Sequence, residues 1–93
     1  ALLLPVAARG ADEQFPKLVA PFLQQHCVAC HGEKRQEGGV RLDGVKGLDA
    51  GNRTLWTLVH QKVSSGEMPP KGRPRPAEAD KDAVLKWAVE RQR

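Results

Sequence analysis

Two thiols and an imidazole lie within five consecutive residues, Cys27-Val28-Ala29-Cys30-His31. This C-x-x-C-H pattern is typical of c-type haem attachment, in which two thiols add to the vinyl groups of haem and the adjacent imidazole binds the iron. On a helical turn, residues three apart lie on the same face, so both sulfurs can reach one edge of the flat ring, with His31 following beneath it. The motif therefore predicts one covalent haem c, held by Cys27 and Cys30 and ligated by His31.

Three other kinds of site also use cysteines at this spacing. A dithiol redox site usually lies at a helix start in a β-α-β context, but no strand-like run of Val and Ile precedes Cys27. A zinc site would combine the motif with His26 or His60, but no second ligand pair completes the usual four. A disulfide would close a loop too small to stabilise much, and it would leave His31 without a role.

A haem iron bound by His31 has a sixth coordination position, and Met68 is the best candidate to fill it. Met68 is the only methionine of the chain, and the two prolines after it make its loop rigid. A thioether ligand stabilises ferrous iron and raises the reduction potential. Core packing is the commoner role of a lone methionine, but an acidic residue and two prolines make this a poor core position. The rival ligand is His60, whereas His26 is tethered to the proximal side of the haem.

Apolar residues at helical spacing predict a first helix that leads directly into the motif: Phe15, Leu18, Val19, Phe22 and Leu23. Pro16 suits the first turn of this helix. Pro21 would cost a hydrogen bond in mid-helix, so we expect the regular part to begin near Ala20 or a kink to occur there. Gly32 is the expected stop.

Two further helices are expected, over residues 54–64 and 77–92. Asn52 or Thr54 is the expected cap of the first, and Gly66 ends it. The second presents an apolar stripe with an aromatic anchor beside it, made of Val84, Leu85, Ala88, Val89 and Trp87.

Two irregular segments connect the expected helices. Residues 33–53 hold five glycines, so this stretch is expected to wrap over the haem as a loop, with Val40 and Leu42 pointing inward. Residues 67–76 hold four prolines and form a stiff loop. No strand pattern longer than three residues interrupts this all-helical organisation.

The composition is that of one small domain with a thin core of its own. The chain has 93 residues, of which two Trp and two Phe are the aromatic ones. A haem would supply a large apolar plate around which short helices can pack. Fifteen Lys and Arg against eleven Asp and Glu give a net charge of +4. The excess is dispersed, without the basic stripe of a nucleic-acid binder, so nucleic acid is not an expected partner.

The N-terminal eight residues are apolar but too short for a membrane span, which needs ~20 apolar residues. They resemble the end of a signal-peptide hydrophobic region followed by small residues suited to cleavage. We therefore expect residues 1–14 to be a trimmed leader remnant or an extended arm, and residues 15–93 to form the haem domain. Either reading suits a periplasmic or otherwise exported protein, because haem attachment of this kind is normally completed outside the cytoplasm.

The order of several short segments resembles the small cytochrome c domains of planctomycete-type proteins, within the class I cytochrome c fold. These segments are Pro21-Phe22-Leu23, Cys27 to Gly32, Gly38-Gly39-Val40-Arg41-Leu42-Asp43, Met68-Pro69-Pro70 and Lys86-Trp87-Ala88. The resemblance covers residues 15–91. It implies an all-α fold in which three main helices wrap around one covalently attached haem.

The same resemblance implies a role for individual residues. Cys27 and Cys30 would carry the thioether bonds. His31 would be the proximal iron ligand and Met68 the distal one. Arg41 would approach a haem propionate, with a solvent-exposed arginine as the alternative.

The expected function is one-electron transfer between protein partners, without enzymatic chemistry. Two alternatives stay open: a haem enzyme or gas-sensing domain with a displaceable sixth ligand, and a relay subunit of a larger electron-transfer assembly. Three cations follow Met68 closely: Lys71, Arg73 and Arg75. They would steer an acidic redox partner toward the haem edge, unless the loop is merely solvated.

Overall fold

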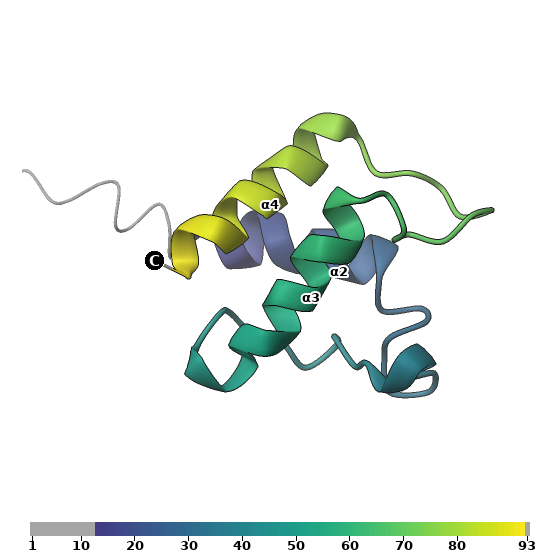
Figure 1. The fold of residues 1–93 in the computed structure, drawn as a ribbon. Helices are drawn as coiled ribbons and strands as arrows, with labels where there is room; N and C mark the ends of the chain where they lie inside the picture. The colour runs from purple at the N-terminus through teal and green to yellow at the C-terminus, as the bar shows by residue number, and fades with distance from the viewer. Residues whose placement is uncertain (1–12, 93) are drawn as a thin grey trace, which may run out of the picture.

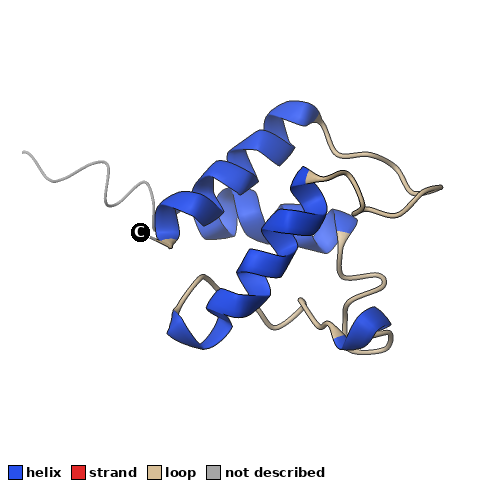
Figure 2. Cartoon of the chain, viewed as in Figure 1, coloured by secondary structure: helices blue, strands red, loops and turns tan. Residues whose placement is uncertain are grey.

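The computed structural model describes residues 13–92, and this part of the chain consists of helices and loops without a strand (Figure 1, Figure 2). The all-α prediction is thereby confirmed. None of the described helices is long and apolar enough to cross a membrane. The predicted leader remnant or arm lies outside the described residues, apart from Glu13 and Gln14.

The N-terminal helix has two sections, and a proline lies at their junction. A π-helical section, η1, spans Phe15–Val19, and the α-helix α2 spans Ala20–His26. The backbone N–H of Ala20 bonds to the carbonyl of Phe15, five residues earlier. Pro21, which has no N–H to donate, therefore falls in the first turn of α2, directly after the wider turn of η1. The expected start of regular helix near Ala20 is confirmed.

Helix α4 (Glu78–Arg91) contacts both the N-terminal helix and helix α3 (Arg53–Ser64). Trp87 is the common contact. Its ring centroid lies 5.7 Å from that of Phe15 in η1, and 5.0 Å from that of Trp56 in α3, edge to face. The N-terminal helix and the last helix therefore pack together, with Trp87 as the predicted aromatic anchor (Figure 1).

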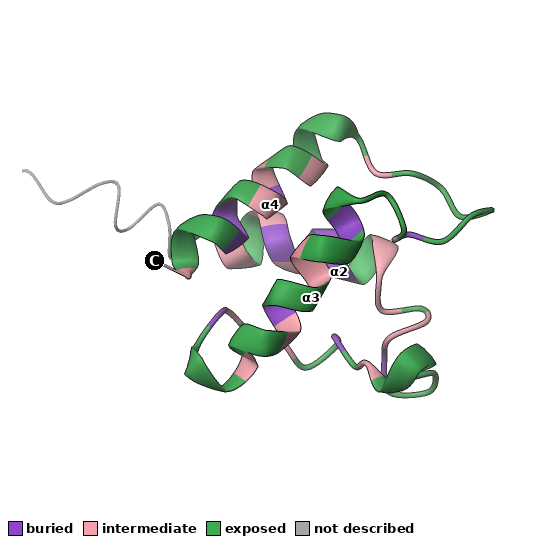
Figure 3. Ribbon diagram, viewed as in Figure 1, coloured by how far each residue is buried: buried purple, intermediate pink, exposed green. Residues whose placement is uncertain are grey.

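The core lies where the helices face one another, and the outer faces of the helices are exposed (Figure 3). Its buried members are Val19, Phe22, Leu23, Leu42, Leu48, Trp56, Val63, Val84, Trp87 and Ala88. The prediction was wrong for Val89, which is 41% exposed. Trp87 and Ala88 occupy the centre of the buried face of α4, so the next helical step turns Val89 toward solvent.

The start of α3 is capped by a residue that the sequence analysis did not single out. The carboxylate of Asp49 accepts hydrogen bonds from the N–H groups of Gly51 (2.8 Å) and Asn52 (3.1 Å), and the Asn52 side chain accepts one from the Asp49 N–H (2.9 Å). This capping box begins the 3₁₀ turn η3 (Ala50–Asn52), which continues into α3. Asn52 thus belongs to the cap, but as the partner of Asp49. Gly66, at φ +84°, ends α3 as expected.

Candidate haem site

The C-x-x-C-H motif forms a tight turn directly after α2. The N–H of Cys27 still bonds to the carbonyl of Leu23 (2.9 Å), and the N–H of His31 bonds to the carbonyl of Cys27 (2.9 Å). The intervening residues make one turn closed by the bonds from the N–H groups of Cys30 and His31 to the carbonyl of Cys27. The turn places Cys27 and His31 in the lining of the cavity described below, whereas Cys30 is half-buried and does not line it.

Gly32 is required by the close approach of the backbone at this turn. A Cβ atom on Gly32 would lie 2.5 Å from the carbonyl oxygen of Val28, too short for any real contact. The carbonyl of His31 accepts a hydrogen bond from the N–H of buried Leu42 (2.6 Å). The backbone around His31 is therefore held on both sides.

A cavity of about 470 Å³ lies beside this turn. It is bordered by the motif, the glycine-rich loop, α3 and the loop after α3. Its lining residues are Cys27, His31, Glu37, Gly38, Val40, Leu42, Leu58, Val59, Lys62, Val63 and Met68. Most of them are apolar, and the expected inward positions of Val40 and Leu42 agree with this lining.

The donor groups facing this cavity fit a haem. The Nδ1 atom of His31 is buried and has no hydrogen-bond partner among the described residues, so the imidazole is not committed to another protein group. Both cysteines are free thiols, and burial raises the pKa of Cys27 to about 11. Imidazole nitrogen and thioether sulfur are donors that haem iron accepts. Across residues 13–92, no three His, Cys, Asp or Glu side chains gather in a group that would hold a metal ion, as the zinc interpretation requires.

Met68 lines this cavity together with Cys27 and His31, although it is remote from them in sequence. Its N–H bonds to the carbonyl of Lys62 in the last turn of α3 (3.0 Å). The Met68–Pro69 peptide bond is cis, and Pro69 is buried. The loop thus brings the only thioether to the same cavity as the imidazole of His31.

The two other histidines do not line this cavity. His60 lines a separate hollow of about 350 Å³ together with Thr57 and Val89. His26 packs its ring 5.0 Å from that of Phe22 and lies beside Pro69, next to the Met68 loop. Of the two candidates for the sixth ligand, Met68 thus shares the cavity of His31 and His60 lines a different hollow.

Arg41 forms a two-pronged ion pair with Asp43 on the surface. Its Nε lies 2.7 Å from one carboxylate oxygen and its Nη2 lies 3.0 Å from the other. The hydrogen bond from Arg41 holds the pKa of Asp43 below its usual value. Arg41 is not among the residues that line the cavity, so its contact with a haem propionate stays a prediction.

The two charged residues that line the cavity, Lys62 and Glu37, each form an ion pair with a residue of opposite charge. Lys62 bonds to Glu67 at 2.9 Å, and Arg35 bonds to Glu37 at 2.6 Å. The hydrogen bond in each pair lowers the pKa of the carboxyl group. Charge at the cavity rim is therefore locally balanced, and the interior keeps its apolar character.

The three loop cations differ in their contacts. Arg75 turns back and donates hydrogen bonds to the backbone carbonyls of Gly66 and Pro69. Lys71 and Arg73 are exposed, and within residues 13–92 their side chains make no hydrogen bond or ion pair. No local pattern in the sequence distinguishes Arg75 from Lys71 and Arg73, because its partners are carbonyls six and nine residues earlier.

Comparison with known proteins agrees with this geometry. A family model described as Planctomycete cytochrome C matches residues 27–72, from the first cysteine of the motif through the Met68 loop. No curated protein and no solved structure matches the chain significantly. The cytochrome c family implies covalently bound haem c, as the motif does. Over residues 27–72, the chain matches the planctomycete cytochrome c family that its motifs resemble.

Proposed function

We propose that this c-type cytochrome transfers single electrons, with one haem bound through Cys27 and Cys30 and ligated by His31 and Met68. The observation that carries the proposal is the shared cavity: the imidazole of His31 and the thioether of Met68 line the same apolar space beside Cys27. These are the donor types of a six-coordinate cytochrome iron.

Each part of the chain has a role in this proposal. When bound, the haem would supply an iron that alternates between the ferric and ferrous states. The two thiols would hold the ring through carbon–sulfur bonds, so that the cofactor cannot dissociate. Val40, Leu42 and Val63 would exclude water from the ring, and the solvent access of such a site helps to set its reduction potential.

The fixed position of Met68 supports electron transfer over the alternative of a haem enzyme or gas sensor. An enzyme or sensor needs a sixth position that opens to an external ligand. The Met68 backbone is instead tied to Lys62, and buried Pro69 follows it. A relay subunit in a larger electron-transfer assembly would use the same haem site in the same way.

The first test is the content of the purified protein. We expect an intact mass equal to that of the polypeptide plus one haem, and a low-spin absorption spectrum in both oxidation states. Cys27→Ala and Cys30→Ala should each leave at most one thioether bond and lower the yield of holoprotein. A mass equal to the bare polypeptide, or zinc in place of iron, would disprove the proposal.

The second test concerns the sixth ligand. Met68→Ala should abolish the weak far-red sulfur-to-iron band of the ferric protein, lower the reduction potential and let cyanide or carbon monoxide bind readily. His60→Ala is the control and should change none of these properties, because His60 lines a different hollow. Low-spin haem that survives Met68→Ala and is lost on His60→Ala would assign the ligand to His60.

A further inference from the structure

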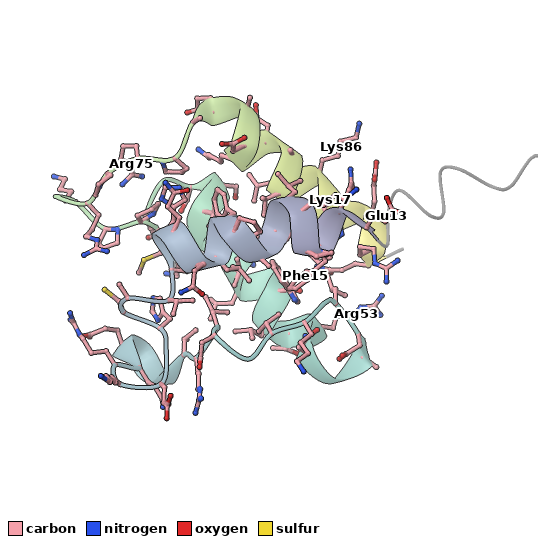
Figure 4. All side chains as sticks on the ribbon, turned by 180° about the vertical axis from the view of Figure 1, so that it is seen from behind. Glu13, Phe15, Lys17, Arg53, Arg75 and Lys86 are labelled. Carbon is pink, nitrogen blue, oxygen red and sulfur yellow. The ribbon has the colours of Figure 1, made fainter. Side chains whose placement is uncertain are left out.

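The loop that carries Met68 is closed by an arginine from the other end of the same loop. Arg75 lies on the return arm, just before α4 (Figure 4). Its Nη2 donates to the carbonyl of Gly66 at 3.2 Å, and its Nη1 donates to the carbonyl of Pro69. One guanidinium group therefore joins two carbonyls that flank Met68 in the chain, one on each side.

The chemistry of these contacts requires arginine. The guanidinium group is planar and presents its N–H donors as a rigid fork, so two separate carbonyls can be held by one side chain. A lysine ammonium would keep the charge but not the fork. The carbonyl of Pro69 is also fixed from its own side, because Pro69 is buried. The contact therefore ties an exposed surface loop to the buried residue Pro69, next to Met68.

We propose that Arg75 is a positioning residue for Met68: by bridging Gly66 and Pro69 it keeps the thioether loop closed over the cavity. The inference rests on the proposed ligation by Met68 and extends it. It assigns to Arg75 a role different from that of Arg73, two residues earlier, whose side chain makes no such contact among the described residues.

The role can be measured in the holoprotein as the rate at which an external ligand reaches the ferric iron. Cyanide must wait for the Met68 loop to open, so loss of the bridge should speed its binding. We expect Arg75→Gln and Arg75→Lys to raise the rate about tenfold or more, as the loss of two charge-assisted hydrogen bonds would allow. Arg73→Gln, the matched control, should bind cyanide at the parent rate.

A second measurement needs no variant. In the unaltered holoprotein at low temperature, the bridged guanidinium of Arg75 should rotate slowly and give separate Nη proton resonances, whereas those of Arg73 should be averaged. Separate resonances for Arg75 would support the bridge even if its variants fail to fold. Averaged resonances for both arginines would overturn it.

Two results of the cyanide experiment would contradict the role of Arg75. Arg75 variants that bind cyanide as slowly as the parent would overturn the inference, and so would a parent-like Arg75→Lys, since charge alone would then suffice. Failure of the underlying ligation looks different: the unaltered protein would lack the far-red band, and Met68→Ala would not change the cyanide rate.

Discussion

Gly32 allows the sharp turn at the haem motif because it has no side chain. Gly32 is buried, and the carbonyl of Val28 occupies the space where a Cβ atom would stand. That carbonyl is part of the backbone, so relief would require the Cys27–His31 turn itself to move. The residue after the proximal histidine is therefore restricted by packing, quite apart from its role in ending a helix.

We expect Gly32→Ala to destabilise the holoprotein by about 1–3 kcal/mol, the usual cost of forcing extra volume into a packed site. The measurement is the free energy of unfolding from guanidinium titration. Gly44→Ala is the control, since a Cβ on Gly44 meets nothing within 4 Å. Equal unfolding midpoints for the two variants would contradict this account.

Among the helices, α3 has a special position, because it contributes Leu58, Val59, Lys62 and Val63 to the cavity and ends just before Met68. Its start is held by the capping box of Asp49 and Asn52, and Asn52 also bonds to the carbonyl of Gly47 (2.8 Å). The indole of Trp56 donates to the same carbonyl (3.1 Å). The cap thus links the end of the glycine-rich loop to the core.

Removal of this cap should destabilise α3. Asp49→Ala is expected to lower the free energy of unfolding of the holoprotein by about 0.5–2 kcal/mol, because two N–H groups lose their acceptor. Asp82→Ala, at an exposed position on α4, should have little effect. A loss of stability in Asp82→Ala equal to that in Asp49→Ala would show that the removed charge, and not the cap, is responsible.

At the scale of the molecule, charge and the position of the Met68 loop together suggest where a partner docks. The chain carries a net charge of +4. Arg73 is exposed and lies beside Pro69, next to the proposed distal ligand. Lys86 is also exposed but lies on α4, away from the Met68 loop (Figure 4). We therefore expect the rate of electron exchange with an acidic redox partner to depend more on Arg73 than on Lys86.

Arg73→Glu should slow bimolecular electron exchange with an acidic partner at low salt, without an appreciable change in reduction potential. The difference from the parent should fade as salt shortens the screening length to ~8 Å at physiological ionic strength. Lys86→Glu changes the net charge equally and should have a smaller effect on the rate. Equal rates for both variants across a salt series would eliminate this docking surface.

Features that depend on neighbouring residues could be predicted from the sequence alone. The C-x-x-C-H motif is contiguous, and the helices that became α2, α3 and α4 follow from local apolar spacing and from Pro21 and Gly66 as boundaries. The all-α fold and the family were predictable on the same grounds. Both follow from interactions between residues that are close together in the sequence.

Contacts between segments that are distant in sequence became evident only from the folded chain. It brought Met68 to the cavity of His31 and directed His60 into a different hollow. It turned Arg75 onto the carbonyls around Met68 and exposed Val89. The reason is physical: a periodic pattern identifies an apolar face, but the element packed against it decides which residues are buried. Likewise, an arginine in a sequence carries a charge, and only the folded backbone determines which carbonyls lie within its reach.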